Sequence, residues 1–140
     1  LVDMAIFSEV TPAINQVEVN VFHQQKEAQV YNEKYGVQLE AWAPFAEGRN
    51  NMFSNLELKA IGEKYGKTVA QVILRWLVQR NIVPLSKSVK KSRMEENINI
   101  FDFELSKEDM DKISEMDKKE SSFFSHYDPS IVEMIAGLHQ

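Results

Sequence analysis

The sequence predicts an α/β fold that is built from parallel strands. Three segments rich in aliphatic and aromatic residues, at positions 13–21, 37–45 and 81–86, are followed by segments with a helical pattern, the second of them after a polar loop. Strand–helix units in series imply parallel strands joined by right-handed crossovers. A parallel sheet is normally buried on both faces, and three strands are few for such a sheet. We therefore expect the chain to be a fragment of a larger sheet or of a closed barrel.

The 140-residue chain has the composition of one globular domain, with 44% hydrophobic and 26% charged residues. It contains no cysteine, and His23, His126 and His139 are not spaced as metal ligands, so no metal site is predicted. The net charge of -5 argues against a general nucleic-acid binder. No apolar run approaches the roughly 18 residues that span a bilayer, and the first residues lack the pattern of a secretory signal. A cytoplasmic protein without membrane contact is expected.

The first two strands are each followed by a different kind of segment. After residues 13–21, a helical pattern at 24–36 closes on Gly36, as a C-terminal cap would. After 37–45, the residues 46–51 are read as a polar loop. Strand, helix, strand and loop therefore follow one another in the first third of the chain.

A pair of helices is predicted next, at residues 54–66 and 67–81. The second has the stronger pattern, with apolar residues at i, i+3, i+4, i+7 and i+8, namely Val69, Val72, Ile73, Trp76 and Leu77. Its start is marked by Thr68 and Gln71, which form a capping-box pattern. This helix is expected to be a main contributor to the core.

The third strand leads into a helix whose start is strongly basic. Four of the seven residues from Lys87 to Arg93 are basic, and the helix that follows is expected to carry Met94, Ile98 and Phe101 on one face. Cations in the first turn of a helix oppose the helix dipole, at a cost of a few tenths of a kcal/mol up to about 1 each. Such a run is more often a solvated surface. Alternatively, the segment binds an anion. The helix dipole, the free N–H groups and the basic side chains would then all attract the same ligand.

The position after a parallel strand favours the anion site. Ligands of α/β folds bind outside the carboxyl ends of the strands, and in barrels the loops after the last strands commonly form a phosphate site. Lys87 and Ser88 lie at such a place. Arg93 can offer a planar fork of donors, while Glu96 and Asn97, one helical turn further, offer groups suited to an adenine edge. The chemistry predicts a nucleotide phosphate.

The end of the chain contains one clear helix and a tail. Ser106 with Asp109 three residues later predicts an N-terminal cap. Residues 121–140 are expected to be irregular at first and helical from about Pro129. The pair Phe123 and Phe124 in this tail is read as packing.

Four segments together resemble the aldo-keto reductase family. "KSVKKSRMEEN" followed by "FDFELS" is similar to its cofactor signature, and "PAINQVE", "AWAPF" and "KYGKTVAQVILRW" are similar to its other late landmarks, in order and spacing. The resemblance covers nearly the whole chain and implies an α/β fold that is part of a (β/α)8 TIM barrel, approximately strands 6–8 with their helices. Residues 1–120 would then form the C-terminal half of the barrel, and residues 121–140 its C-terminal tail.

The resemblance implies NADP(H) as the cofactor and a role for each of ten residues. At the adenosine end, Lys87, Ser88 and Arg93 match the residues that bind the 2′-phosphate, and Glu96 and Asn97 match those that contact the adenine. At the nicotinamide end, Gln16 matches the residue that hydrogen-bonds the carboxamide, and Trp42 matches the aromatic residue that stacks on the nicotinamide ring. Between the two ends, Ala43, Phe45 and Ala46 match the backbone that runs beside the pyrophosphate. Ala43 stands where the family often has a serine, so one hydroxyl contact is expected to be missing.

Two of these residues also have simpler interpretations. Considered alone, Gln16 in a valine-rich strand is more often a structural core glutamine, and Trp42 is more often core packing. Their occurrence together with the Lys87 signature favours the cofactor roles.

The family's catalytic tyrosine, lysine, aspartate and histidine come from the first half of the barrel. None of them has a counterpart in this chain. The tyrosines present, Tyr31, Tyr35, Tyr65 and Tyr127, fall in helical or tail positions, so no catalytic residue is assigned.

The resemblance implies an NADP(H)-dependent oxidoreductase that reduces aldehydes or ketones to alcohols. This chain would supply the cofactor-binding half, and the isolated fragment is expected to be inactive. Its partners would be a small carbonyl substrate and either the missing half of the barrel or further copies of itself. The alternative is a nucleotide-binding or regulatory module without turnover.

Overall fold

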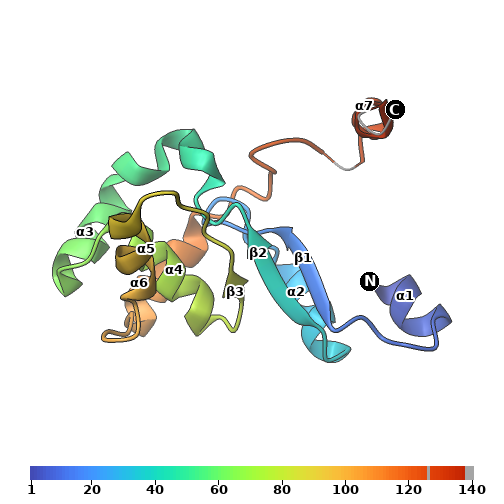
Figure 1. Cartoon of the computed structure of the whole chain (residues 1–140). Coiled ribbons are helices and arrows are strands. Elements are labelled where there is room, and N and C mark those ends of the chain that lie inside the picture. The colour runs from blue at the N-terminus through green and yellow to red at the C-terminus, as the bar shows by residue number, and fades with distance from the viewer. Residues whose placement is uncertain (126, 138–140) are drawn as a thin grey trace.

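The computed structural model describes residues 1–125 and 127–137 and contains a three-stranded sheet with helices around it (Figure 1). The strands are β1 (Ile14–Glu18), β2 (Gln38–Trp42) and β3 (Val83–Pro84), in the order β1-β2-β3. Both strand pairs are parallel. The predicted α/β class with parallel strands is confirmed.

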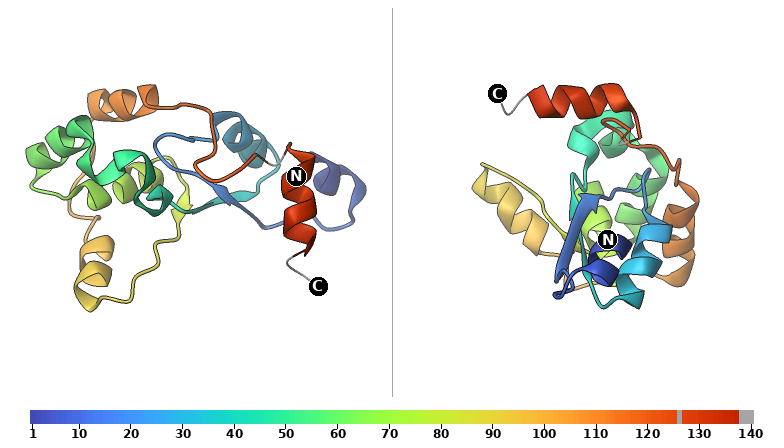
Figure 2. Two further views of the ribbon diagram at one scale, coloured as in Figure 1. Left: turned by 90° about the horizontal axis from the view of Figure 1, so that it is seen from above. Right: turned by 90° about the vertical axis from the view of Figure 1, so that its right-hand side faces the viewer.

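Seven α-helices are found in the described part of the chain. They are α1 (Val2–Phe7), α2 (Lys26–Lys34), α3 (Leu56–Tyr65), α4 (Val69–Gln79), α5 (Lys91–Ile98), α6 (Lys107–Glu115) and α7 (Pro129–Gly137). The turned views show α7 extending away from the body of the molecule (Figure 2). The helix expected from about Pro129 is therefore confirmed. None of these described helices is both long enough and apolar enough to cross a membrane.

The first strand is shorter than the sequence predicts because a turn ends it early. Asn20 and His23 exchange two backbone hydrogen bonds, of 3.0 and 3.1 Å, directly after β1. Val19 and Val21, which were expected to continue the strand, are fully buried beside this turn. Their β-branched side chains therefore serve the core and not strand pairing.

The other two strands end for backbone reasons. β2 stops before Ala43, whose φ of 48° is left-handed, so the prediction that this strand reaches residue 45 is wrong. β3 has two residues, and its Pro84 carries no N–H to donate to a neighbouring strand. The predicted strand at 81–86 is correct in place but not in length.

The predicted polar loop at 46–51 is wrong, because these residues form part of a kinked 3-10 segment. This segment, η1, spans Ala46–Ser54 and contains five residues with non-helical dihedral angles. Gly48, Asn50 and Asn51 have positive φ values, which glycine and asparagine adopt at little cost. The positive φ values at these three positions are therefore compatible with the residue types found there.

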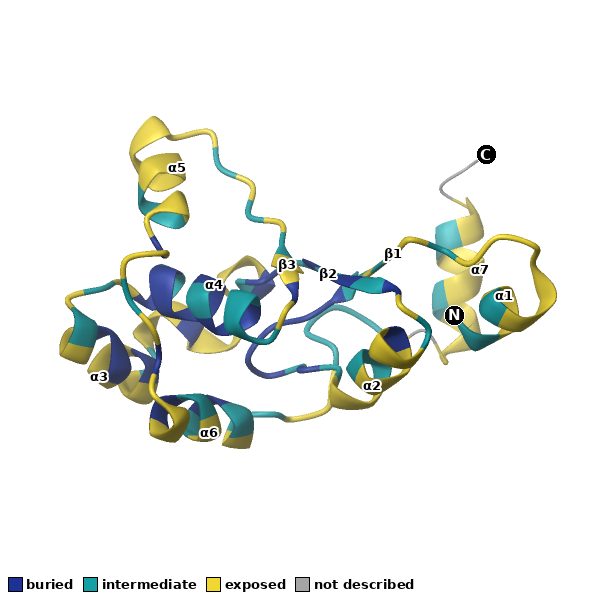
Figure 3. Ribbon diagram, turned by 90° about the horizontal axis from the view of Figure 1, so that it is seen from below, coloured by how far each residue is buried: buried dark blue, intermediate teal, exposed yellow. Residues whose placement is uncertain are grey.

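The core lies on one face of the sheet, under α3, α4 and α6. The predicted apolar stripe of α4 is confirmed, since all five of its residues belong to the core, together with Leu39 and Ala41 of β2. The capping box is confirmed too, because the hydroxyl of Thr68 accepts the N–H of Gln71 and the Gln71 side chain accepts the N–H of Thr68. Figure 3 shows the buried stretches converging on α4.

Helix α5 is exposed, in contrast to α4. No residue of α5 is buried, and Figure 3 shows it standing off from the body of the chain. Met94 and Ile98 are 50% and 72% exposed. The helix ends at Ile98, so the prediction that Phe101 shares its face is wrong. Its contact with the body of the chain includes hydrogen bonds from Thr68 and Gln71, at the start of α4, to Glu96.

A buried carboxylate ties α3 to α6. Asp109 is 1% exposed and accepts hydrogen bonds from Lys64 Nζ (2.6 Å), Tyr65 Oη (2.7 Å) and Ser106 Oγ (2.9 Å). Ser106 also accepts the N–H of Asp109, which confirms the predicted cap. Burial alone would raise the pKa of Asp109, but the hydrogen bonds from Lys64, Tyr65 and Ser106 outweigh it and hold the pKa below its ordinary value of 3.8.

We expect the chain to lose stability in acid through Asp109. A carboxylate whose pKa is lower in the folded state contributes stability above its unfolded pKa and loses that contribution as the pH falls through the folded pKa. The free energy of unfolding should therefore decline from about pH 5 downward. Asp109→Asn should be less stable at pH 7 and should show a flatter decline.

The measurement is urea unfolding followed by circular dichroism between pH 7 and pH 3, at fixed protein concentration. Asp111→Asn is the matched control, because Asp111 lies on the same helix and forms only an exposed pair with Lys107. The same pH profile for wild type and Asp109→Asn would contradict the expected role of Asp109.

Candidate functional site

Six of the residues predicted to bind the cofactor line one groove beyond the carboxyl ends of β2 and β3. The groove has a volume of about 420 Å³ and lies between the starts of α4 and α5. It is lined by Phe45, Phe53, Thr68, Val69, Ala70, Lys87, Ser88, Arg93, Glu96 and Asn97. Residues 20 to 50 positions apart in the sequence are brought together here by the return of the chain after α4.

Two cations of the groove are free to bind an anion. The side chains of Lys87 and Arg93 are exposed, and within residues 1–125 and 127–137 they have no hydrogen-bond or ion-pair partner. Lys90 is the N-cap residue of α5, and Lys91 pairs with Glu95 at 3.7 Å. Neither Lys90 nor Lys91 lines the groove. The four bases of the segment therefore divide into two that face the groove and two that do not.

The polar groups beside these cations are partly engaged. Thr68 Oγ1 donates to Glu96 Oε1 at 2.6 Å, and Asn97 Nδ2 donates to Ser86 Oγ at 3.3 Å. Ser88 Oγ accepts the N–H of Lys90 at 3.1 Å, which shapes the turn before α5. Each of these side chains keeps further donor or acceptor capacity for a ligand.

The sequence did not indicate four of the lining residues. Thr68, Val69 and Ala70 come from the start of α4, and Phe53 comes from η1, where its ring lies 5.6 Å from that of Phe45. The capping box at Thr68 was a usable signal, because it marks a helix start that can face a ligand. Nothing local distinguishes Phe53 from an ordinary surface aromatic residue.

Gln16 and Trp42 lie outside the groove, on the open face of the sheet. In the parallel register Gln16 is opposite Glu40 and Glu18 is opposite Trp42, so these four side chains point to the same face. Gln16 is exposed and its amide nitrogen donates to Glu40 Oε1 at 2.5 Å. The core interpretation of Gln16 is therefore wrong for this structure. Trp42 is half-buried and does not belong to the core cluster.

The turn after β2 connects the two parts of the site. Ala43 and Ala46 both have positive φ, and the N–H of Ala46 donates to the carbonyl of Ala43 at 2.9 Å. This tight turn carries the chain from Trp42 on the sheet to Phe45 in the groove. Ala43 itself does not line the groove.

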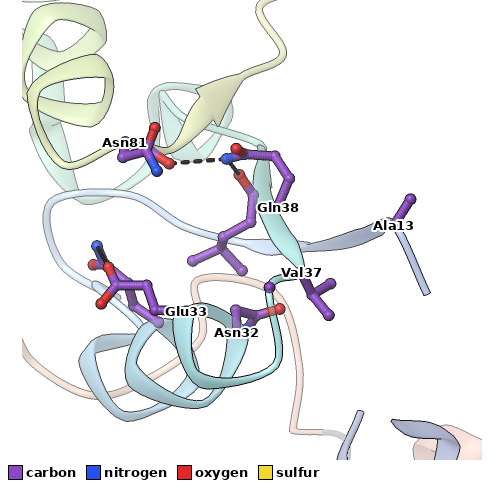
Figure 4. A pocket seen from close by; sticks show the side chains of 9 residues that line it. Ala13, Asn32, Glu33, Val37, Gln38 and Asn81 are labelled. Carbon is purple, nitrogen blue, oxygen red and sulfur yellow. Dashed lines mark hydrogen bonds between the residues drawn. The ribbon is translucent and has the colours of Figure 1, made fainter. Parts of the chain in front are cut away.

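A second pocket lies at the opposite end of the sheet (Figure 4). It has a volume of about 340 Å³ and is lined near the amino ends of the strands by residues that include Asn32, Gln38 and Asn81. The side chain of Gln38 donates to the carbonyl of Asn81 at 2.8 Å across it. Ligands of parallel sheets bind at the carboxyl ends. We therefore place the functional site at the groove and not at this pocket.

The described residues contain no group of histidine and acidic side chains that could hold a metal ion. His23 contacts Gln25 at 3.0 Å, while His126 and His139 lie outside the described residues. Tyr65 donates to Asp109 within the α3–α6 contact.

Comparison with known proteins gives one consistent relationship. The sequence model of the Aldo/keto reductase family matches residues 3–118. The glyoxal reductase of Bacillus subtilis (strain 168) is 49% identical over 113 residues, which are 81% of this chain and 40% of that protein. Among solved structures, MGS-M4, an aldo-keto reductase enzyme from a Medee basin deep-sea metagenome library, has a TM-score of 0.86 and 33% identity over 91% of this chain and 47% of its own.

A further solved structure contains the expected cofactor. The aldo-keto reductase AKR2E5 of the silkworm Bombyx mori, complexed with NADPH, has a TM-score of 0.77 and 38% identity over 83% of this chain and 38% of its own. The chain spans about two fifths of the length of the curated relatives it matches. Because the family model extends over most of the sequence and the sheet and helices superpose on solved members, this chain belongs to the aldo/keto reductase family.

Proposed function

We propose that this chain is the cofactor-binding half of an NADP(H)-dependent reductase of aldehydes and ketones. The observation that carries the proposal is a pair of cations in the groove, Lys87 in the loop before α5 and Arg93 in its first turn, neither of which has a side-chain partner among the described residues. A helix start with two free cations suits a phosphate monoester. The relatives named as a glyoxal reductase and as an NADPH complex support the same assignment.

The groove residues would hold the adenosine end of the cofactor. Lys87, Ser88 and Arg93 would bind the 2′-phosphate, and Glu96 with Asn97 would contact the adenine edge. The groove has a volume of about 420 Å³ and carries Phe45 and Phe53 in its lining, whose rings could contact a planar base. A mononucleotide-sized ligand would therefore fill it.

The sheet residues would hold the nicotinamide end. Gln16 would exchange its hydrogen bond with Glu40 for one to the carboxamide, and Trp42 would present its ring face to the nicotinamide. The turn at Ala43, Phe45 and Ala46 would carry the pyrophosphate between the two ends. When bound, the reduced nicotinamide supplies the hydride, and the residues of this chain bind and orient it.

The assignment makes this chain a part of a larger catalytic unit. Residues 1–120 would form strands six to eight of the barrel with their helices, and residues 121–140 its tail. The catalytic acid would come from the remainder of the barrel, in a cytoplasmic enzyme. A nucleotide-binding or regulatory module without turnover is the second candidate, because the family's catalytic residues are expected from outside this chain.

Two measurements test this proposal. Binding of NADPH to this chain, and to a protein in which it completes a barrel, is followed by isothermal titration. Oxidation of NADPH is then measured with a panel of aldehydes and ketones. We expect turnover from the complete barrel and not from the 140-residue chain. Turnover by the isolated chain would overturn the division of roles, and binding without turnover by the complete barrel would favour the regulatory module.

The isolated chain is also expected to associate. β1 and β3 each pair on one side only in the described residues, and Ile14, Val83 and Leu85 are 54%, 43% and 42% exposed near these edges. Open strand edges and exposed apolar side chains favour association with other chains. Analytical ultracentrifugation should therefore show oligomers or aggregates. A monodisperse monomer with a cooperative thermal transition would contradict the expectation that a further part of the barrel is needed.

A further inference from the structure

The chain after α6 crosses the carboxyl ends of β1 and β2 and is held there by a buried carboxylate. Glu18, the last residue of β1, is 5% exposed. It accepts hydrogen bonds from Ser121 Oγ (2.5 Å), from the N–H of Ser122 (2.9 Å) and from Asn20 Nδ2 (3.0 Å). Hydrogen bonds to an ionised carboxylate are roughly twice as strong as those between neutral groups, so the contacts from Ser121 and Ser122 hold the segment firmly. We call residues 121–124 the tail strap.

A second anchor comes from the kinked segment η1. Arg49 Nη1 donates to the carbonyl of Ser122 at 2.8 Å, and Asn50 Nδ2 donates to Ser122 Oγ at 3.2 Å. The Arg49 guanidinium also lies 4.4 Å from the ring centre of Phe123. Unlike Glu18, the Arg49 side chain is 49% exposed. Its Nη2 also lies 3.6 Å from Glu47 Oε2, so an anionic ligand that draws Arg49 away must compete with this exposed carboxylate as well as with Ser122.

The strap covers part of Trp42. The ring centres of Phe123 and Trp42 are 5.0 Å apart, with an angle of 49° between the ring planes. A planar ligand that stacks on this side of Trp42 must displace Phe123. The strap and such a ligand therefore compete for one aromatic surface.

We propose that Glu18 and Arg49 are positioning residues that hold the tail strap over Trp42, and that an anionic group bound beside η1 releases it. A guanidinium can bind a phosphate through two parallel hydrogen bonds and with opposite charge, whereas a carbonyl is a neutral acceptor. A pyrophosphate group near η1 would thus draw Arg49 away from Ser122 and from Phe123. Glu18 would keep Ser121 in place, so that the strap pivots at Ser121 and uncovers Trp42. The second step rests on the proposed function, whereas the anchors do not.

The anchors are tested by hydrogen exchange of the amides of Ser122, Phe123 and Phe124, without any ligand. Glu18→Gln should speed this exchange by roughly 10- to 100-fold, because hydrogen bonds to a charged group are lost. Glu120→Gln is the control, since Glu120 is an exposed carboxylate next to the strap. Ser121→Ala, at a half-exposed position, gives a second variant should Glu18→Gln fail to fold. Unchanged exchange in Ser121→Ala would overturn the anchor.

The release is tested by adding inorganic pyrophosphate or NADPH to a protein in which this chain completes a barrel. Each should speed strap exchange several-fold in the wild type and should have no effect in Arg49→Ala, whose strap is already loosened. NADPH that binds while the strap stays protected would overturn the release. Failure of NADPH to bind would overturn the proposed function and the release together, while the ligand-free exchange would still decide whether Glu18 anchors the strap.

Discussion

Arg93→Ala is expected to weaken NADPH binding by roughly 10- to 100-fold and NADH binding by less than about threefold. Arg93 lines the groove and has no side-chain partner in the described residues, so its loss removes a ligand contact and breaks no internal one. A charge-assisted hydrogen bond to phosphate contributes about 1.5–3 kcal/mol. Only NADPH carries the 2′-phosphate, so only its affinity should fall.

The matched control is Lys91→Ala. Lys91 lies two residues from Arg93 in the first turn of α5, its side chain is 90% exposed, and its partner is Glu95. Lys91→Ala removes one positive charge from the helix start, as Arg93→Ala does, but it removes no side chain that lines the groove. Binding of both nucleotides is measured by isothermal titration in a protein with a complete barrel. Equal losses of NADPH and NADH affinity in Arg93→Ala would show that the site does not distinguish the phosphate.

Gly62→Ala is expected to destabilise the chain by about 3 kcal/mol and to lower the melting temperature by roughly 10 °C. A Cβ atom at Gly62 would lie 2.4 Å from the carbonyl oxygen of Lys67, which is a backbone atom. The N–H of Lys67 in turn donates to the carbonyl of Gly62 at 2.9 Å. The link between α3 and α4 is therefore held against α3 by this hydrogen bond, and moving it to make room for a methyl group would cost stability.

Gly137→Ala is the control for this substitution. A Cβ atom at Gly137 meets nothing within 4 Å, and the residue lies in α7. Alanine should leave the melting temperature unchanged or raise it slightly, because it favours a helix over glycine by up to about 1 kcal/mol. Thermal unfolding is followed by circular dichroism, at fixed protein concentration, in a protein in which this chain completes a barrel. The same melting temperature for Gly62→Ala and wild type would mean that the α3–α4 link can shift to accommodate a methyl group.

Both functional inferences depend on the same edge of the sheet. The groove receives its cations from the loop after β3, and the strap covers the ends of β1 and β2. A dinucleotide lying from Arg93 to Trp42 would cross the turn at Ala43 and pass η1, where Arg49 is located. The expected phosphate contact and the expected release of the strap are therefore two consequences of one binding event.

The sequence by itself determined the features that depend on neighbouring residues. The capping box at Thr68, the N-cap at Ser106, the apolar stripe of α4 and the order of strands and helices were predicted correctly, because each rests on contacts within a few positions. The resemblance to the family singled out Lys87 and Arg93 among the four bases, and the structure places both beside the groove.

Only the tertiary structure decided the features that join distant parts of the chain. The hydrogen bond from Ser121 to Glu18 spans 103 positions, and that from Arg49 to Ser122 spans 73. The place of Phe53 and Thr68 in the groove, and the early end of β1 before two buried valines, likewise depend on where the chain returns. Local propensity cannot specify such contacts, since their free energy is gained only when the core and the parallel sheet have brought the segments together.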